Sequence, residues 1–138
     1  MPAKDIFHNI VKQALEKDGW TITHDPLYLD FGGVELYIDL GAEKLITAEK
    51  EGEKIAVEVK SFISGSTISE FHKALGQLIN YRVALSQKQP EREIYLAVPN
   101  TTYEIFFKLE LIQLVIKSQN IKLIIYNPDQ EVIQQWIK

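Results

Sequence analysis

The period of the hydrophobic pattern changes along the chain, and the first half reads as one helix followed by strands. Residues 3–17 carry apolar side chains at helical spacing, which ends at Asp18 and Gly19. Residues 20–24 are compatible with a short strand, and the next pair of glycines marks a turn. Three further segments favour strands, with a tight turn joining the last two: 34–40, 44–50 and 54–62.

The second half alternates helices with strands. Residues 67–70 (TISE) form a capping box, and apolar residues then recur at helical spacing up to Leu85. A second capping box at 101–104 (TTYE) begins an apolar helix that we expect to end near Ile116. Two more segments favour strands, and a final segment closes the chain: 93–98, 121–126 and then 132–137.

The order helix, three strands, helix, strand, helix, strand (αβββαβαβ) predicts an α/β fold with a mixed central sheet flanked by helices. At 138 residues, without linkers, repeats or low-complexity segments, we expect residues 1–138 to form a single domain. No apolar run is long enough to span a bilayer and nothing resembles a signal peptide. We therefore expect a cytoplasmic protein without a membrane partner.

Composition excludes several classes of function. The chain has no cysteine, which rules out disulfides, thiol catalysis and cysteine-ligated zinc. The net charge of −4 argues against tight, nonspecific binding to a polyanion, and the only arginines are Arg82 and Arg92, so sequence-specific readout of guanine is disfavoured. A nucleic-acid enzyme remains compatible with this charge, because a bound cation offsets the negative charge of a metal-binding pocket.

The segment KIAVEVKSF, residues 54–62, carries two charges on an otherwise apolar strand. Because side chains alternate between the faces of a strand, Glu58 and Lys60 share one face with Ala56. One interpretation is a solvated face or a surface ion pair, which is the usual reason for charges in strands. The other is a site in which the carboxylate holds a divalent cation and the amine steadies a water or a phosphate.

With an acidic residue upstream, Glu58-Val59-Lys60 resembles the active-site motif of the PD-(D/E)XK nuclease superfamily, which has the restriction-endonuclease-like fold. The resemblance implies a magnesium-dependent DNA endonuclease, with Mn²⁺ as an alternative cation. Asp39 and Glu58 would bind the metal, with the Val59 carbonyl as a third ligand. Lys60 would position the attacking water, supported by Gln77.

The upstream acid leaves alternatives open. Asp39 is the best match, but Ile38 stands where the motif has proline, and Glu43 is a rival acid at the start of the next strand segment. Asp39 lies between apolar residues, so burying it without a partner would be costly, and a cation is one way to satisfy it. A solvated aspartate near a turn is the alternative interpretation.

The helix after the Glu-x-Lys strand contains Gln77-Leu78-Ile79-Asn80-Tyr81, which resembles the Q-x-x-x-Y motif of the RecB-like branches of that superfamily. Gln77 and Tyr81 lie one turn apart, so both occupy one side of the helix. The resemblance implies that Gln77 orients the site and that Tyr81 approaches DNA. The spacing alone also arises by chance in many helices.

Nearly the whole chain is similar to the XisH family, the excision controlling factors of the fdxN element in cyanobacteria. The segments that carry the similarity include MPAKDIFH, DGWTITHDPL, IDLGAEK, KIAVEVKSF, ISEFHKALGQLINYR and YLAVP. The resemblance implies a role in DNA rearrangement, with DNA, a companion protein of the XisI type and a recombinase complex as partners. It leaves catalysis open: the alternative is a noncatalytic regulator or partner-binding protein on the same fold. A homo-oligomer is also compatible with the sequence.

The remaining candidates are weaker. The three histidines have no zinc-site spacing, so a catalytic zinc is not expected. His24 and Asp25 could support the site from a loop, with a turn cap as the alternative role. Glu16 could correspond to the first-helix acid of some superfamily branches, but it projects away from the apolar stripe, which favours a solvated position.

Overall fold

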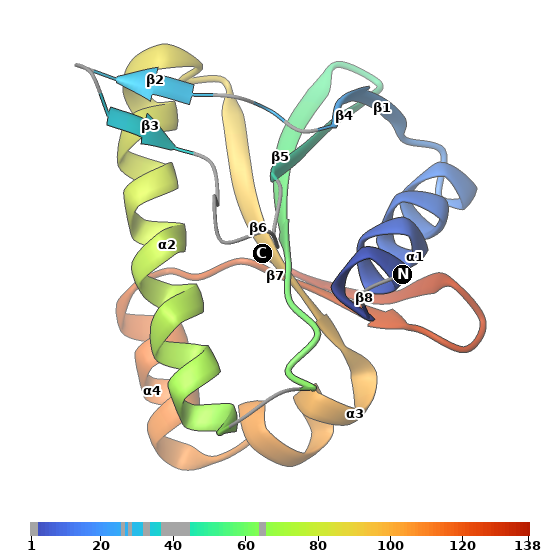
Figure 1. The fold of residues 1–138 in the computed structure, drawn as a ribbon, viewed down its shortest axis with the longest axis vertical. Helices are drawn as coiled ribbons and strands as arrows, with labels where there is room; N and C mark the ends of the chain where they lie inside the picture. Colours follow the sequence, from blue (N-terminus) through green and yellow to red (C-terminus); the bar gives the residue numbers. More distant parts are fainter. Residues whose placement is uncertain (1–2, 26, 28, 32–33, 37–44, 64–65) are drawn as a thin grey trace.

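The computed structural model describes residues 3–25, 27, 29–31, 34–36, 45–63 and 66–138 (Figure 1). Its strands are β1 (Thr21–His24), β2 (Leu29–Phe31), β3 (Val34–Leu36), β4 (Leu45–Lys50), β5 (Glu53–Val59), β6 (Arg92–Pro99), β7 (Leu123–Asn127) and β8 (Val132–Ile137). Its helices are α1 (Ala3–Lys17), α2 (Thr67–Lys88), α3 (Asn100–Thr102) and α4 (Glu110–Ser118), with a π-helical turn, η1 (Tyr103–Phe107), between α3 and α4.

Six of these strands form one sheet in the order β1-β4-β5-β6-β7-β8, and β2 pairs with β3 in a separate sheet. The three central strands, β5, β6 and β7, are parallel to one another, whereas β1, β4 and β8 are antiparallel to their neighbours. The predicted α/β fold with a mixed sheet is confirmed. The carboxyl ends of β5, β6 and β7 therefore lie at the same edge.

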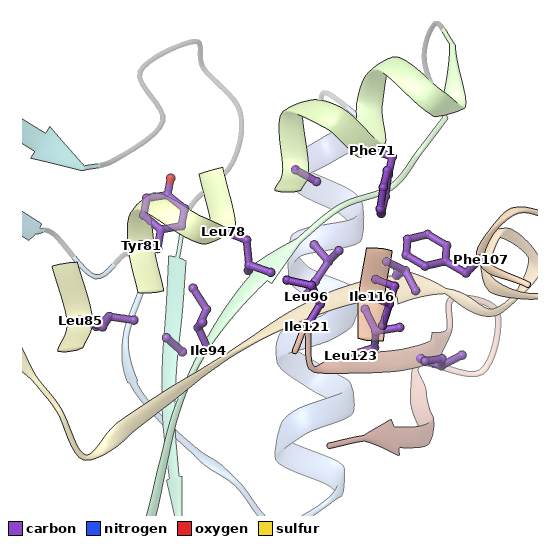
Figure 2. Packing of buried hydrophobic residues seen from close by; sticks show 14 of the residues in the cluster. Phe71, Leu78, Tyr81, Leu85, Ile94, Leu96, Phe107, Ile116, Ile121 and Leu123 are labelled. Carbon is purple, nitrogen blue, oxygen red and sulfur yellow. The ribbon is translucent and has the colours of Figure 1, made fainter. Parts of the chain in front are cut away.

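Helices cover both faces of this sheet (Figure 1). One core lies between α2, α4 and the face that carries Ala56 and Leu96, and Figure 2 shows Phe71, Leu78 and Ile116 converging there. The other core packs α1 against the opposite face. The predicted alternation of β5 is confirmed for its apolar residues, because Ala56 belongs to the first core and the residues on either side of it belong to the second.

None of the helices in the described part of the chain combines the length and the apolarity needed to cross a membrane.

The strand in the predicted segment 34–40 does not belong to the main sheet. Within the described residues of segment 34–40, β3 pairs with β2 in a small antiparallel hairpin, in which Phe31 lies opposite Val34. The place beside β4 is taken by β1 instead, because Thr23 and His24 both make hydrogen bonds to the buried hydroxyl of Thr47. The closing segment, which the pattern left unassigned, is β8, an edge strand on β7.

The predicted helix from residue 101 to 116 is interrupted. It consists of α3, the π-helical turn η1 and α4, with a break at Lys108 and Leu109. Leu109 has an extended backbone conformation (φ −63°, ψ 144°), which ends the π-helical turn and restarts the helix at Glu110. A capping box and apolar residues at helical spacing predict a helix, but they do not reveal such a change of winding.

Tyr126, in β7, ties the centre of the sheet to the end of β5. Its side chain is fully buried, and its hydroxyl donates a hydrogen bond of 3.1 Å to the main-chain carbonyl of Lys60. Burial raises the pKa of Tyr126 well above its usual value, so the hydroxyl remains a donor at neutral pH.

We expect Tyr126→Phe to lower the free energy of unfolding by about 1–3 kcal/mol, because it removes a donor from a buried carbonyl without changing the ring. Chemical denaturation at pH 7 measures this. Tyr103→Phe is the matched control, since the Tyr103 hydroxyl makes no hydrogen bond within the described residues and its ring is only half-buried. Equal stability of both variants and the wild type would contradict the role assigned to Tyr126.

Candidate functional site

Two oppositely charged side chains are buried at the carboxyl end of β5. Glu58 is 0% exposed and Lys60 is 1% exposed, although most other charged residues of the described chain are at the surface. Glu58 lies beside Leu96 of β6 in the parallel register, on the face covered by α2. The sequence interpretation as a solvated face is therefore wrong for this pair. Burying two such groups costs several kcal/mol each unless their environment stabilises the charges.

Lys60 reaches from the end of β5 to helix α2. Its ammonium donates a hydrogen bond of 2.8 Å to the side-chain oxygen of Gln77. A hydrogen bond from a charged donor is stronger than a neutral one, and low local polarity strengthens it further. The structure thus brings together Lys60 and Gln77, two residues that the sequence had placed in one site.

The backbone of Lys60 is held on both sides. Its amide donates to the carbonyl of Ala97 in β6 at 3.0 Å, and its carbonyl accepts from the Tyr126 hydroxyl. Ser61, the next residue, is also buried. These contacts restrict the direction in which the amine can point. The sequence analysis missed Tyr126, although a hydroxyl in the apolar strand segment 121–126 was a signal that it has a polar contact.

Tyr81 lies in the core rather than at a surface. Its side chain is 4% exposed, and its ring packs with Leu78 and Leu85 of the same helix (Figure 2). The three residues follow helical spacing i, i+3 and i+7, so they form one apolar stripe. In Figure 2 the hydroxyl of Tyr81 points away from the labelled core residues. The DNA contact of Tyr81 remains a prediction, and because the ring is buried it would involve the hydroxyl alone.

The other predicted metal ligands are Asp39, with Glu43 as its alternative, and the Val59 carbonyl. Asp39 and Glu43 lie outside the described residues, and the Val59 carbonyl remains a predicted ligand. Within the described part of the chain, no group of three histidine, aspartate or glutamate side chains is arranged to hold a metal ion. Of the predicted carboxylate ligands, Glu58 is therefore the one that the structure describes. A cation bound to it would need further oxygen ligands.

The loop residues proposed as support for the site have other contacts. Asp25 binds the side chains of His8 and Lys12, each at 2.6 Å, and so anchors the loop to α1. Partial burial of the Asp25 carboxyl acts to raise its pKa, but the hydrogen bonds and charges of Lys12 and His8 outweigh it and hold the pKa below the usual value. His24 contacts Thr47 of β4, and Glu16 is exposed, as expected.

A separate pocket of about 180 Å³ lies at the amino end of β6 and is lined by both arginines. Arg92 donates to the Ile55 carbonyl and to Gln89, and Arg82 donates to the Gln119 carbonyl at the end of α4. Arg82 thus connects α2 to the end of α4, and Arg92 connects the end of α2 to β5. We assign them a structural role.

The chain matches the model of one protein family, described as XisH protein, over residues 1–134. A similar crystal structure is that of an XisH family protein from Nostoc punctiforme, with 59% identity, a TM-score of 0.90, and coverage of 97% of this chain and 100% of that one. Another is a fdxN element excision controlling factor protein from Anabaena variabilis, with 55% identity, a TM-score of 0.91, and coverage of 97% and 99%. No curated protein shows significant similarity. The chain belongs to the XisH family.

Proposed function

We propose that this protein controls excision of a DNA element and that it carries a PD-(D/E)XK-type, magnesium-dependent endonuclease site. The observation that carries the proposal is the hydrogen bond from the buried Lys60 ammonium to the partly buried Gln77, on the same strand face as the buried Glu58. A buried ion is weak evidence for stability, because well-packed apolar residues of similar volume often stabilise a protein as much or more. The cost of burying Lys60 and Glu58 therefore favours a chemical role. The 55% identity to the excision controlling factor supports the role in excision.

The donor set suits a hard cation. Mg²⁺ is usually held by one or two carboxylates, with waters and phosphate oxygens completing its shell. Glu58 would supply one carboxylate, the Val59 carbonyl a second oxygen and Asp39 the other carboxylate. When bound, the cation would polarise the scissile phosphate and make a bound water more acidic.

Lys60 and Gln77 have distinct roles in this scheme. The Lys60 ammonium would hold the attacking water or a phosphate oxygen, and Gln77 would fix the direction of the amine through the hydrogen bond of 2.8 Å. DNA would be the substrate, and a companion protein of the XisI type and a recombinase complex would be partners. Tyr81 would contact DNA through its hydroxyl.

A noncatalytic regulator on the same fold is the second candidate, and one observation favours it. Glu58 and Lys60 are both closed off from solvent, whereas a phosphodiester has to reach a nuclease site. On this alternative the buried pair fixes the junction of β5 and α2, and the surface binds the excision partners.

We expect millimolar Mg²⁺ or Mn²⁺ to raise the melting temperature of the wild type by about 3–6 °C at roughly ten times the dissociation constant, because a ligand of the folded state stabilises it. Glu58→Gln should abolish this increase. Glu93→Gln, at an exposed carboxylate paired with Lys122, is the matched control and should respond like the wild type. The same increase in all three proteins, measured by differential scanning fluorimetry, would place the cation elsewhere.

Lys60→Met separates the two candidate functions, because methionine keeps an apolar stem of similar length and lacks the amine. If Lys60 supports cleavage, the variant should fold, bind its companion protein, and lose both magnesium-dependent DNA cleavage and element excision in cells. Lys122→Met, at a partly exposed amine, should keep wild-type excision. Wild-type excision by Lys60→Met, at matched protein levels, would remove the nuclease proposal and leave the noncatalytic regulator.

A further inference from the structure

Helix α4 exposes apolar side chains that do not pack into the hydrophobic core of the protein. Leu111 is 64% exposed and Leu114 is 58% exposed, while Ile112 and Ile116 on the other side of the helix are buried in the core. Ile105, in the π-helical turn just before α4, is 76% exposed. In Figure 1, α4 lies at the periphery of the molecule, on the same side of the sheet as α2. Exposed apolar residues gathered on one element mark an interaction surface.

Charged residues flank this apolar surface at both ends of α4. Glu110 lies in the first turn and Lys117 in the last turn, and both are exposed. At 100° per residue, Glu110, Leu114 and Lys117 fall on one side of the helix, with Leu111 beside them. Neither charge forms an ion pair with any other described residue, in contrast to the pair between Glu104 and Lys108 in the preceding turn.

This arrangement is complementary to itself. Glu110 and Lys117 are seven residues apart, or about 10 Å along the axis, with Leu114 near the midpoint. When two copies of α4 pack antiparallel about a twofold axis, Glu110 of one copy faces Lys117 of the other, twice, and the two Leu114 side chains meet at the axis. Parallel packing would instead place Glu110 against Glu110 and Lys117 against Lys117. Charge complementarity therefore selects the antiparallel pair.

We propose that the protein forms a twofold symmetric homodimer through antiparallel packing of α4 against α4 of a second copy. A helix of nine residues buries an interface at the small end of the range for specific complexes, and we expect a weak dimer with a dissociation constant of about micromolar. Leu114 is the central contact, and it occurs twice in the dimer.

Sedimentation equilibrium of the full chain between about 1 and 100 µM tests the proposal. The average mass should rise with concentration from that of one 15.9 kDa chain towards twice that value. Leu114→Glu should weaken the dimer by about 100-fold or more, since it places two like charges at the axis. Val83→Glu, at a valine of α2 that is 62% exposed, is the matched control and should dimerise like the wild type.

A charge exchange tests the antiparallel register. Glu110→Lys and Lys117→Glu should each weaken the dimer by about 10-fold, and the double variant should return to within about threefold of the wild type, because it restores both opposite-charge contacts. Circular dichroism checks that every variant is folded. A wild type that stays monomeric, a dimer that survives Leu114→Glu, or a double variant as weak as the single ones would each overturn the proposal.

Discussion

The hydrogen bond between the Lys60 ammonium and the Gln77 side-chain oxygen is the contact on which the arrangement of the site depends. It joins the end of a central strand to the middle of the helix that covers it, so strand position and helix rotation are set together. In a medium less polar than water, such a hydrogen bond stabilises a buried ammonium more than it would in water. Without a partner, the buried ammonium would lower the free energy of unfolding by several kcal/mol. A shift in the register of β5 by one residue would move Lys60 to the opposite face, against α1.

The parallel centre of the sheet determines where polar groups can gather. β5, β6 and β7 end at the same edge, and the main chain of Lys60 is held there by Ala97 of β6 and Tyr126 of β7. Sites in α/β proteins form at the carboxyl ends of parallel strands, because the chain leaves the sheet there and side chains are released from the core. The antiparallel neighbours β4 and β8 begin at this edge, where Leu45 lies opposite Glu58 and Val132 lies opposite Asn127.

Local sequence patterns predicted most helices and strands, but they could not predict contacts between residues that are distant in the sequence. The alternation of residues 54–62 was enough to place Glu58 and Lys60 on one face, and the helix after it placed Gln77 nearby. The pattern gave no sign that Ser66, one residue before the predicted capping box, caps α2, nor that Leu109 restarts a helix. The burial of Tyr81 was readable from its spacing to Leu78 and Leu85, but the motif interpretation gave it a surface role instead.

The net charge of the chain bears on how the proposed site would bind DNA. The chain carries a net charge of −4, so the proposed dimer would carry −8 (two chains of −4), and the general attraction that draws basic proteins to DNA is absent. Both guanidinium groups already donate hydrogen bonds within the protein, Arg82 to the end of α4 and Arg92 to β5 and the end of α2, which makes them poor candidates to hold a phosphate backbone. For the proposed endonuclease site, DNA affinity would then have to come from a bound cation, from lysines or from another protein. The companion protein and recombinase complex proposed as partners are one way to meet this requirement, and the same argument holds for the proposed noncatalytic regulator.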